Sequence, residues 1–310
     1  MPSPPARHPR VQPAGNNFAW NKDARPFYPR AERKQKKREM EKAFGVCTVN
    51  ITAWSSLKAE IEADAEWLKP VHILLVQEHK LRANELRGVL LYLAGRGWSA
   101  HFGTCLKGKG GGRSAGVGIM WRSWITRASE PAELVRGRLV AVAFQVKIGP
   151  FERVWFASLY ATTDSEAARS AQLRAFGRWH GEQSWPVVLG GDFNMDKVDT
   201  AAWSPAECAI VSTGPQDFTC VGPDHVSTID YFMVSTCTSA YVGQISTQTS
   251  GIATHKPVKM VFKMLAHDPM VTTVQAGTRT AAGPVFGPHL EELTDTDWQH
   301  AYDRADGLAA

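Results

Sequence analysis

The chain contains the stretch Val187-Val188-Leu189-Gly190-Gly191-Asp192-Phe193-Asn194, in which an apolar run ends in two glycines, a carboxylate and an amide. This pattern predicts a buried strand whose C-terminal end delivers polar side chains into a cleft. Asp192 and Asn194 point to the same face of an extended segment, because successive side chains alternate. A carboxylate beside an amide on one rigid support suits the binding of a phosphate and its attacking water. Both residue types also build turns after strands, so this stretch alone leaves a structural role open.

Three further segments place polar side chains at predicted strand ends. The run Ile73-Leu74-Leu75-Val76-Gln77-Glu78 ends in an amide and a carboxylate. The run Ser227-Thr228-Ile229-Asp230-Tyr231-Phe232-Met233-Val234 carries an acid inside a strand pattern, and Thr254-His255-Lys256-Pro257-Val258 places a histidine before another strand. Four such segments along one chain favour a catalytic site over separate turns.

On these residues the chain resembles the endonuclease/exonuclease/phosphatase superfamily, which includes deoxyribonuclease I, and most closely the endonuclease domain of LINE-type retrotransposons. The resemblance covers roughly residues 44–264. The motifs that carry it are Val49-Asn50-Ile51, Gln77-Glu78, Leu159-Tyr160-Ala161, Gly191-Asp192-Phe193-Asn194, Phe218-Thr219, Ser227-Thr228-Ile229-Asp230 and His255-Lys256-Pro257-Val258. It implies an α/β fold, a four-layer sandwich of two mostly antiparallel sheets flanked by helices.

The chain departs from the family pattern at one position. The family usually ends in Ser-Asp-His, and here Thr254 precedes His255. The family aspartate contributes to the metal and phosphate site. Its replacement leaves open a nuclease that has lost part of its activity.

Composition and charge set the domain organisation. The chain has 310 residues, 44% of them hydrophobic, and a formal net charge of +5, which permits a polyanionic partner. We expect a disordered basic N-terminal segment at 1–42, the catalytic domain at 43–265 and a flexible tail at 266–310. Five dispersed cysteines without a CxxC pair argue against a disulfide framework and a structural zinc site.

Targeting signals are missing from the sequence pattern. No apolar run approaches the length of a membrane span, and the N-terminus lacks the apolar core of a signal peptide. We therefore expect a nuclear or cytoplasmic protein that is not secreted and has no membrane partner.

Hydrophobic periodicity predicts alternating helices and strands. Apolar residues at helical spacing predict one helix over 57–68, ended by Pro70, and others over 86–93 and 165–180. The predicted strands cover 44–51, 71–76, 115–121, 139–146, 154–160, 187–189, 229–234 and 258–262. Helices alternating with strands, and strand pairs between them, favour two sheets packed face to face with helices outside.

A glycine-rich stretch, Gly108-Lys109-Gly110-Gly111-Gly112-Arg113-Ser114, has the composition of a phosphate cradle but not the order of a P-loop. We expect a basic loop whose Lys107, Lys109 and Arg113 contact backbone phosphates of a substrate.

The remaining residues receive roles in phosphodiester hydrolysis. Glu78 is the candidate ligand for Mg²⁺, with Mn²⁺ as the alternative ion, because hard cations take carboxylate oxygens. Asp230 would fix the tautomer of His255. Asp192 would position or deprotonate the water.

Four further residues support this set. Asn194 would orient the water, and Asn50 would support the metal carboxylate or bind phosphate. Tyr160 would bind phosphate or help the leaving oxygen, although a core aromatic role stays open. Thr219 and Ser227 are expected to bind substrate.

Three functions remain open from these residues. The first is a metal-dependent DNA endonuclease of the retrotransposon type, with a reverse transcriptase encoded elsewhere. The second is a phosphomonoesterase acting on a lipid or nucleotide, because the same site serves both reactions. The third is a nucleic-acid-binding remnant of reduced activity.

Overall fold

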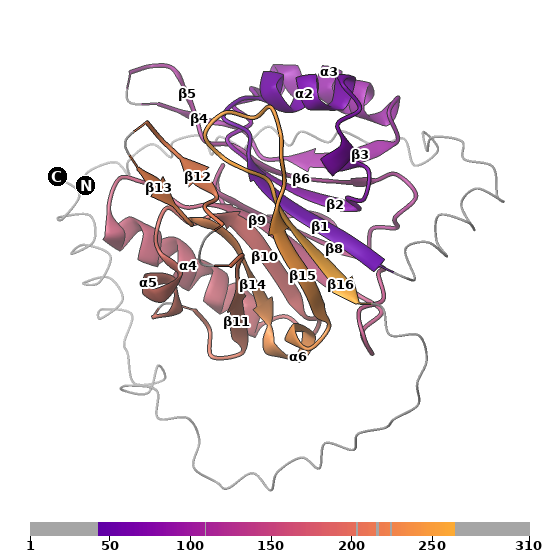
Figure 1. The fold of residues 1–310 in the computed structure, drawn as a ribbon, viewed down its shortest axis with the longest axis vertical. Helices are drawn as coiled ribbons and strands as arrows, with labels where there is room; N and C mark the ends of the chain where they lie inside the picture. Colours follow the sequence, from indigo (N-terminus) through magenta and orange to yellow (C-terminus); the bar gives the residue numbers. More distant parts are fainter. Residues whose placement is uncertain (1–42, 109, 203, 215–216, 224, 264–310) are drawn as a thin grey trace, which may run out of the picture.

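The computed structural model describes residues 43–108, 110–202, 204–214, 217–223 and 225–263. Two six-stranded sheets dominate this part of the chain (Figure 1). The expected disordered segment at 1–42 and the expected tail at 266–310 lie outside the described residues.

Each of the two sheets has its one parallel strand pair at the centre. The first sheet runs β15 (Val242–Thr247), β16 (Val258–Lys263), β1 (Ala43–Asn50), β2 (Ile73–Gln77), β6 (Val117–Arg122), β3 (Trp98–Phe102). The second sheet runs β11 (Cys208–Val211), β14 (Asp230–Ser235), β10 (Val187–Asp192), β9 (Val154–Tyr160), β8 (Leu139–Phe144), β7 (Ala132–Val135). Each contains one parallel pair, β1 with β2 and β9 with β10, and all its other pairings are antiparallel.

Helices and two short ribbons complete the described chain. The helices are α2 (Trp54–Glu62), a 3₁₀ turn at Glu66–Leu68, α3 (Ala83–Ala94), α4 (Glu166–Gly181), α5 (Lys197–Ala201) and α6 (Thr236–Ser239). The ribbons pair β4 (Leu106–Lys107) with β5 (Arg113–Ser114), and β12 (Cys220–Val221) with β13 (Val226–Ser227). No helix within the described ranges is both long enough and apolar enough to cross a bilayer.

Three apolar clusters show the four layers. One lies between the sheets and includes Leu75 and Phe232. A second joins the outer face of the first sheet to α2 and α3, and a third joins the outer face of the second sheet to α4. Figure 1 shows α2 and α3 together on one side and α4 on the other. The expected sandwich of two mostly antiparallel sheets flanked by helices is confirmed.

The parallel pairs bring the polar strand ends together. In β1 and β2, Asn50 lies opposite Gln77, and in β9 and β10, Tyr160 lies opposite Asp192. Carboxyl ends of parallel strands meet at one edge of a sheet. Because the two sheets stack, both edges form one end of the sandwich, and Asp192 also lies opposite Asp230 of β14.

The two glycines of β10 allow close packing at this end. A Cβ on Gly190 would lie 2.7 Å from Leu75 of the opposite sheet, and a Cβ on Gly191 would lie 2.1 Å from the carbonyl oxygen of Leu159. Any larger side chain would therefore push the sheets or the strands apart.

The structure corrects parts of the predicted element list. The single helix expected over 57–68 is two elements, because Asp64 has a left-handed φ of 50° after α2 and the 3₁₀ turn follows. Strands β3, β7, β11 and β15 were not predicted, since they are the edges of the two sheets, and the side chains of β7, β11 and β15 are partly buried or exposed. The long buried strands lie where apolar runs predicted them.

Candidate active site

Asp192 is the centre of the polar cluster at the end of the sandwich. Its Oδ2 accepts a hydrogen bond of 2.9 Å from Nδ2 of Asn50, which comes from the opposite sheet. Its Oδ1 accepts one of 3.0 Å from the backbone N–H of Asn194. The Asn194 amide nitrogen donates to the carbonyl oxygen of Ala161 at 2.8 Å. Asn194 has a φ of 50°, a left-handed conformation that asparagine tolerates, and its backbone N–H lies against the Asp192 carboxylate.

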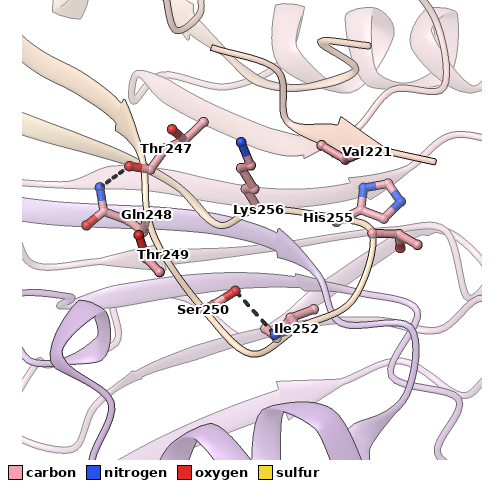
Figure 2. A pocket seen from close by; sticks show the side chains of 9 residues that line it. Val221, Thr247, Gln248, Thr249, Ser250, Ile252, His255 and Lys256 are labelled. Atoms are coloured by element: carbon pink, nitrogen blue, oxygen red, sulfur yellow. Dashed lines mark hydrogen bonds between the residues drawn. The ribbon is translucent and has the colours of Figure 1, made fainter. Parts of the chain in front are cut away.

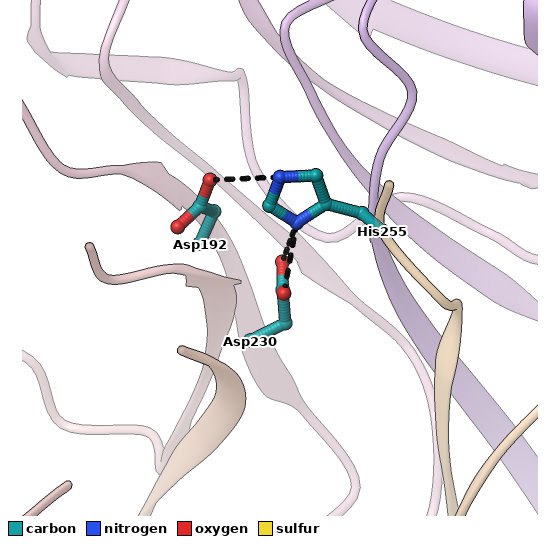
Figure 3. A group of neighbouring side chains, drawn as sticks. All are labelled: Asp192, Asp230 and His255. Atoms are coloured by element: carbon teal, nitrogen blue, oxygen red, sulfur yellow. Dashed lines mark hydrogen bonds and ion pairs between the residues drawn. The ribbon is translucent and has the colours of Figure 1, made fainter. Parts of the chain in front are cut away.

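Asp230 and His255 form the expected pair (Figure 3). Nδ1 of His255 lies 3.0 Å from Oδ2 and 3.2 Å from Oδ1 of Asp230, whose side chain is fully buried. Nε2 of the same ring lies 3.9 Å from Oδ2 of Asp192. The imidazole is therefore held between two carboxylates, with Nδ1 committed to one and Nε2 turned toward the other.

Burial and charge shift two pKa values in this cluster. Burial, followed by the neighbouring charge of Asp230, raises the pKa of the Asp192 carboxyl, although His255, Asn50 and Asn194 oppose the shift. Burial by itself would lower the pKa of His255. The hydrogen bond and charge of Asp230, with the charge of Asp192, outweigh it and raise that pKa. The pair therefore favours a carboxyl that takes up a proton readily beside an imidazolium.

Thr219 holds the backbone at Asp230 through its side-chain hydroxyl. Its hydroxyl accepts the backbone N–H of Ile229 at 3.1 Å and of Asp230 at 3.0 Å, and its side chain is fully buried. This burial does not support the substrate contact expected from the sequence. Ser227, the other residue expected to bind substrate, is only partly buried, and its carbonyl oxygen accepts the N–H of Thr219.

Glu78 lies at the rim of the cluster. The hydroxyl of Tyr160 donates to its Oε1, and Nζ of Lys80 lies 3.0 Å from its Oε2. Burial, then the hydrogen bond and charge of Glu78, raise the pKa of Tyr160, so its hydroxyl keeps its proton at neutral pH. The structure thus joins Glu78 and Tyr160, and adds Lys80, which the sequence analysis did not single out.

The donor chemistry of the cluster fits a hard divalent cation. The carboxylate oxygens of Glu78 and Asp192 and the amide of Asn50 belong to one end of the sandwich. Sγ of Cys220 lies 3.8 Å from Nε2 of His255, but burial and the charges of Asp230 and Asp192 raise the pKa of this thiol, which disfavours a thiolate ligand. Burial and the charge of Asp230 raise the pKa of Asp192, and a cation beside it would favour its charged form. A second group of potential ligands comprises Asp192, Asp230 and His255, whose ligand atoms lie within 4.8 Å of one another.

The basic loop is a two-stranded ribbon. Lys107 of β4 pairs with Arg113 of β5, and Lys107 is exposed. Nη1 of Arg113 lies 3.0 Å from a carboxylate oxygen of Glu85 in α3, and it also donates to the carbonyl oxygen of Lys80 at 3.4 Å. Lys109 lies outside the described residues. The ribbon is therefore tied to the segment that follows Glu78, with Lys107 open to solvent.

Thr254 precedes His255 with a left-handed φ of 67°, which is unusual for a β-branched side chain. Its hydroxyl donates to the neighbouring carbonyl oxygen of Ala253 at 2.7 Å, and the residue is exposed. The position at which the family pattern has an acid therefore brings no charge to the site.

A buried polar bridge between the sheets was also missed by sequence reasoning. Nε2 of Gln77 donates to Oγ of Ser158 at 2.9 Å, and Oγ of Ser158 donates to the carbonyl oxygen of Val76 at 3.0 Å. Gln77 also contacts Thr48 in the neighbouring strand. A polar side chain inside each apolar run was the only signal. The bridge fixes how the two sheets, and hence the two halves of the site, sit against each other.

Comparison with known proteins identifies the family. The chain matches the Endonuclease/Exonuclease/phosphatase family over residues 54–251, more than half of its length. It therefore belongs to this family of metal-dependent nucleases and phosphodiesterases. Glu78, Tyr160, Asp192 and Asp230 lie inside the matched range, and His255 lies just beyond it. No curated protein sequence matches the chain significantly.

Solved structures share the fold at low sequence identity. The AP endonuclease LMAP from Leishmania major is 16% identical, with a TM-score of 0.56 over 77% of this chain and 92% of that one. The endonuclease domain of TRAS1, a telomere-specific non-LTR retrotransposon, is 14% identical, with a TM-score of 0.52 over 72% and 99%. A humanized D. rerio TDP2 is 12% identical, with a TM-score of 0.53 over 71% and 99%. At these identities the likeness shows the fold alone.

Proposed function

We propose that this protein is a Mg²⁺-dependent DNA endonuclease of the retrotransposon type. The observation that carries the proposal is the position of Asp192, a buried carboxylate held by Asn50 and Asn194 and 3.9 Å from Nε2 of His255. This arrangement places a carboxylate that can act as a base beside an imidazole held by Asp230, and Glu78 at the same end of the sandwich is the proposed ligand of the metal ion. Hydrolysis of a phosphodiester needs a base and a cation, because a water must lose a proton while the phosphate gains negative charge.

The roles follow from the contacts. Asp192 accepts the proton of the attacking water, and its raised pKa suits a base that works near neutral pH. The amide nitrogen of Asn194 is anchored to the backbone, which leaves its carbonyl oxygen to orient that water. His255, kept charged by Asp230, donates from Nε2 to a phosphate oxygen. The hydroxyl of Tyr160 donates to Oε1 of Glu78 in the structure, and it would turn to the phosphate or the leaving oxygen when Glu78 binds the ion.

Glu78 would hold the metal ion, with Asn50 beside it. When bound, Mg²⁺ or Mn²⁺ would neutralise charge on the phosphate and so favour attack. Lys80 occupies one oxygen of Glu78, so it would give up or share that oxygen when the ion binds.

DNA is proposed as substrate on two grounds. The net charge of the chain is +5, and Lys107 is exposed on a ribbon tied to the metal edge of the site. In addition, one structural neighbour is a retrotransposon endonuclease domain, and a D. rerio TDP2 neighbour, 13% identical with a TM-score of 0.52, was solved with a single-strand DNA product. The reverse transcriptase partner and the nuclear or cytoplasmic location stay predictions.

Plasmid nicking tests the proposal. Supercoiled DNA should be nicked with Mg²⁺ and not with EDTA, and Asp192→Asn should abolish nicking because an amide cannot take the proton. Asp199→Asn, an exposed acid in α5, is the matched control and should nick at the parental rate.

Two outcomes would contradict the proposal. Faster turnover of inositol phosphates or nucleotide monophosphates than of DNA would indicate a phosphomonoesterase. DNA binding without nicking, whichever divalent cation is added, would indicate a binding remnant. The uncharged Thr254, at the position where the family pattern has an acid, is the structural reason to consider this outcome.

A further inference from the structure

A polar pocket opens beside His255, and its other lining residues have no role in the proposed chemistry (Figure 2). It encloses about 440 Å³ and lies between the loop that joins β15 to β16 and the β12 strand. Its lining residues are Val221, Thr247, Gln248, Thr249, Ser250, Ile252, Thr254, His255 and Lys256. The volume falls within the range of small-molecule sites, roughly 300–1,000 Å³.

The loop wall of the pocket is fixed in place. One carboxylate oxygen of Glu60, on α2, accepts the backbone N–H of Gly251 at 2.8 Å, and the other accepts the indole N–H of Trp67 at 2.6 Å. Ile252 is buried in the apolar cluster under α2 and α3. The loop between β15 and β16 accordingly rises toward α2 in Figure 1. The pocket is therefore preformed, which lowers the entropy cost of binding a ligand.

The opposite wall is joined to the catalytic cluster. The N–H of Val221 donates to the carbonyl oxygen of Thr254 at 2.8 Å, and the N–H of Lys256 donates to that of Thr219 at 2.7 Å. His255 lies between these two contacts and lines the pocket. A molecule bound here would therefore adjoin the ring that faces Asp192.

The lining chemistry suits a nucleotide. Hydroxyl and amide side chains dominate it, Lys256 supplies a positive charge, and none of the described lining residues carries a carboxylate. Gln248 uses its amide N–H groups within the loop, on Oγ of Ser246 and the carbonyl oxygen of Thr247, both at 2.9 Å. Its carbonyl oxygen is then the atom left to accept from a ligand. Val221, 41% exposed, adds an apolar surface.

We propose that this pocket binds the nucleotide next to the scissile phosphodiester, with Lys256 on its phosphate and Gln248 on its base or sugar. The inference rests on the proposed function and extends it, because it assigns a substrate subsite outside the catalytic cluster. Neutral donors and acceptors discriminate nucleotides, whereas the lysine attracts any backbone phosphate.

Two substrates separate this subsite from the chemical step. A short DNA duplex contains the neighbouring nucleotide, whereas bis(p-nitrophenyl) phosphate has the same reacting group without it. Lys256→Ala and Gln248→Ala should each raise KM for the duplex roughly 3- to 10-fold, with kcat and the turnover of bis(p-nitrophenyl) phosphate unchanged. Lys263→Ala is the matched control, because Lys263 is exposed at the far end of β16.

Binding without cleavage gives a second readout. In EDTA, fluorescence anisotropy of the labelled duplex should show weaker binding by Lys256→Ala, with a salt dependence reduced by about one counterion. Lys263→Ala should keep the parental salt dependence.

The outcomes distinguish the two levels of the argument. A parent that cleaves the duplex while both pocket variants match it in KM and anisotropy refutes the subsite alone. Equal losses on both substrates also refute it, because the pocket would then act in the chemical step. A parent that cleaves only the small diester refutes the DNA endonuclease, and the subsite with it.

Discussion

Removal of the Thr219 hydroxyl would test how the site is held. Thr219→Val keeps the shape of the side chain but deprives two backbone N–H groups, those of Ile229 and Asp230, of their acceptor. Each buried donor left unsatisfied costs about 1–3 kcal/mol. Because the two N–H groups share one acceptor oxygen, we expect the free energy of unfolding to fall by about 2–4 kcal/mol, less than two independent hydrogen bonds would cost. Because the backbone of Asp230 would shift, its contact with His255 should loosen and kcat fall about 10- to 100-fold.

Urea unfolding followed by tryptophan fluorescence measures the stability term. The midpoint should fall while the denaturant slope stays the same. Thr228→Val is the control, because its hydroxyl makes only an exposed hydrogen bond of 3.5 Å, so its effect should stay within about 0.5 kcal/mol. If the two variants are equally stable and Thr219→Val instead raises KM with kcat unchanged, Thr219 contacts substrate and its assigned structural role is wrong.

Three further predictions concern charge. Glu78→Gln should weaken Mg²⁺ binding at least about 10-fold by calorimetry without unfolding the protein, whereas Glu85→Gln, a surface acid, should not; equal Mg²⁺ affinity in both would exclude Glu78 as ligand. Thr254→Asp should raise Mg²⁺ affinity because it adds a carboxylate. Thr254→Asn should not, although asparagine tolerates a positive φ as well as aspartate does. A gain in both variants would mean that relief of the strained backbone, and not charge, raises the affinity. Burial lowers the pKa of His72 to about 4, so the folded state keeps this ring neutral. The unfolded chain therefore binds a proton more readily than the folded one, and the free energy of unfolding should fall by up to about 3 kcal/mol as the pH drops from 6.5 toward 4. In His72→Gln the free energy of unfolding, measured with urea, should depend less on pH over that window. An unchanged pH dependence would contradict the shift.

Much of the fold could be predicted from the sequence because its central strands are buried on both faces. Such strands must be apolar throughout, so Val154–Tyr160 and Val187–Asp192 stand out as continuous runs. Edge strands such as β15 are half exposed and have no comparable pattern. The break after α2 was missed for a related reason, because apolar spacing continues from Leu57 to Leu68 although the backbone turns at Asp64.

The residues of the polar cluster stand out in the sequence because each follows or interrupts an apolar run, where a polar side chain has a cost that only a partner or a function offsets. The sequence by itself therefore singled out side chains that the fold brings into one cluster, including Asn50, Asp192, Asp230 and His255. The pairing of Asp230 with His255 was also predicted, but the other contacts in the cluster were decided only by tertiary structure. Asn50 reaches Asp192 across 142 residues of chain, and Thr219 proved to be a buried support for Asp230. Contacts of this kind depend on how two sheets stack and where a loop is pinned, and no local pattern encodes either.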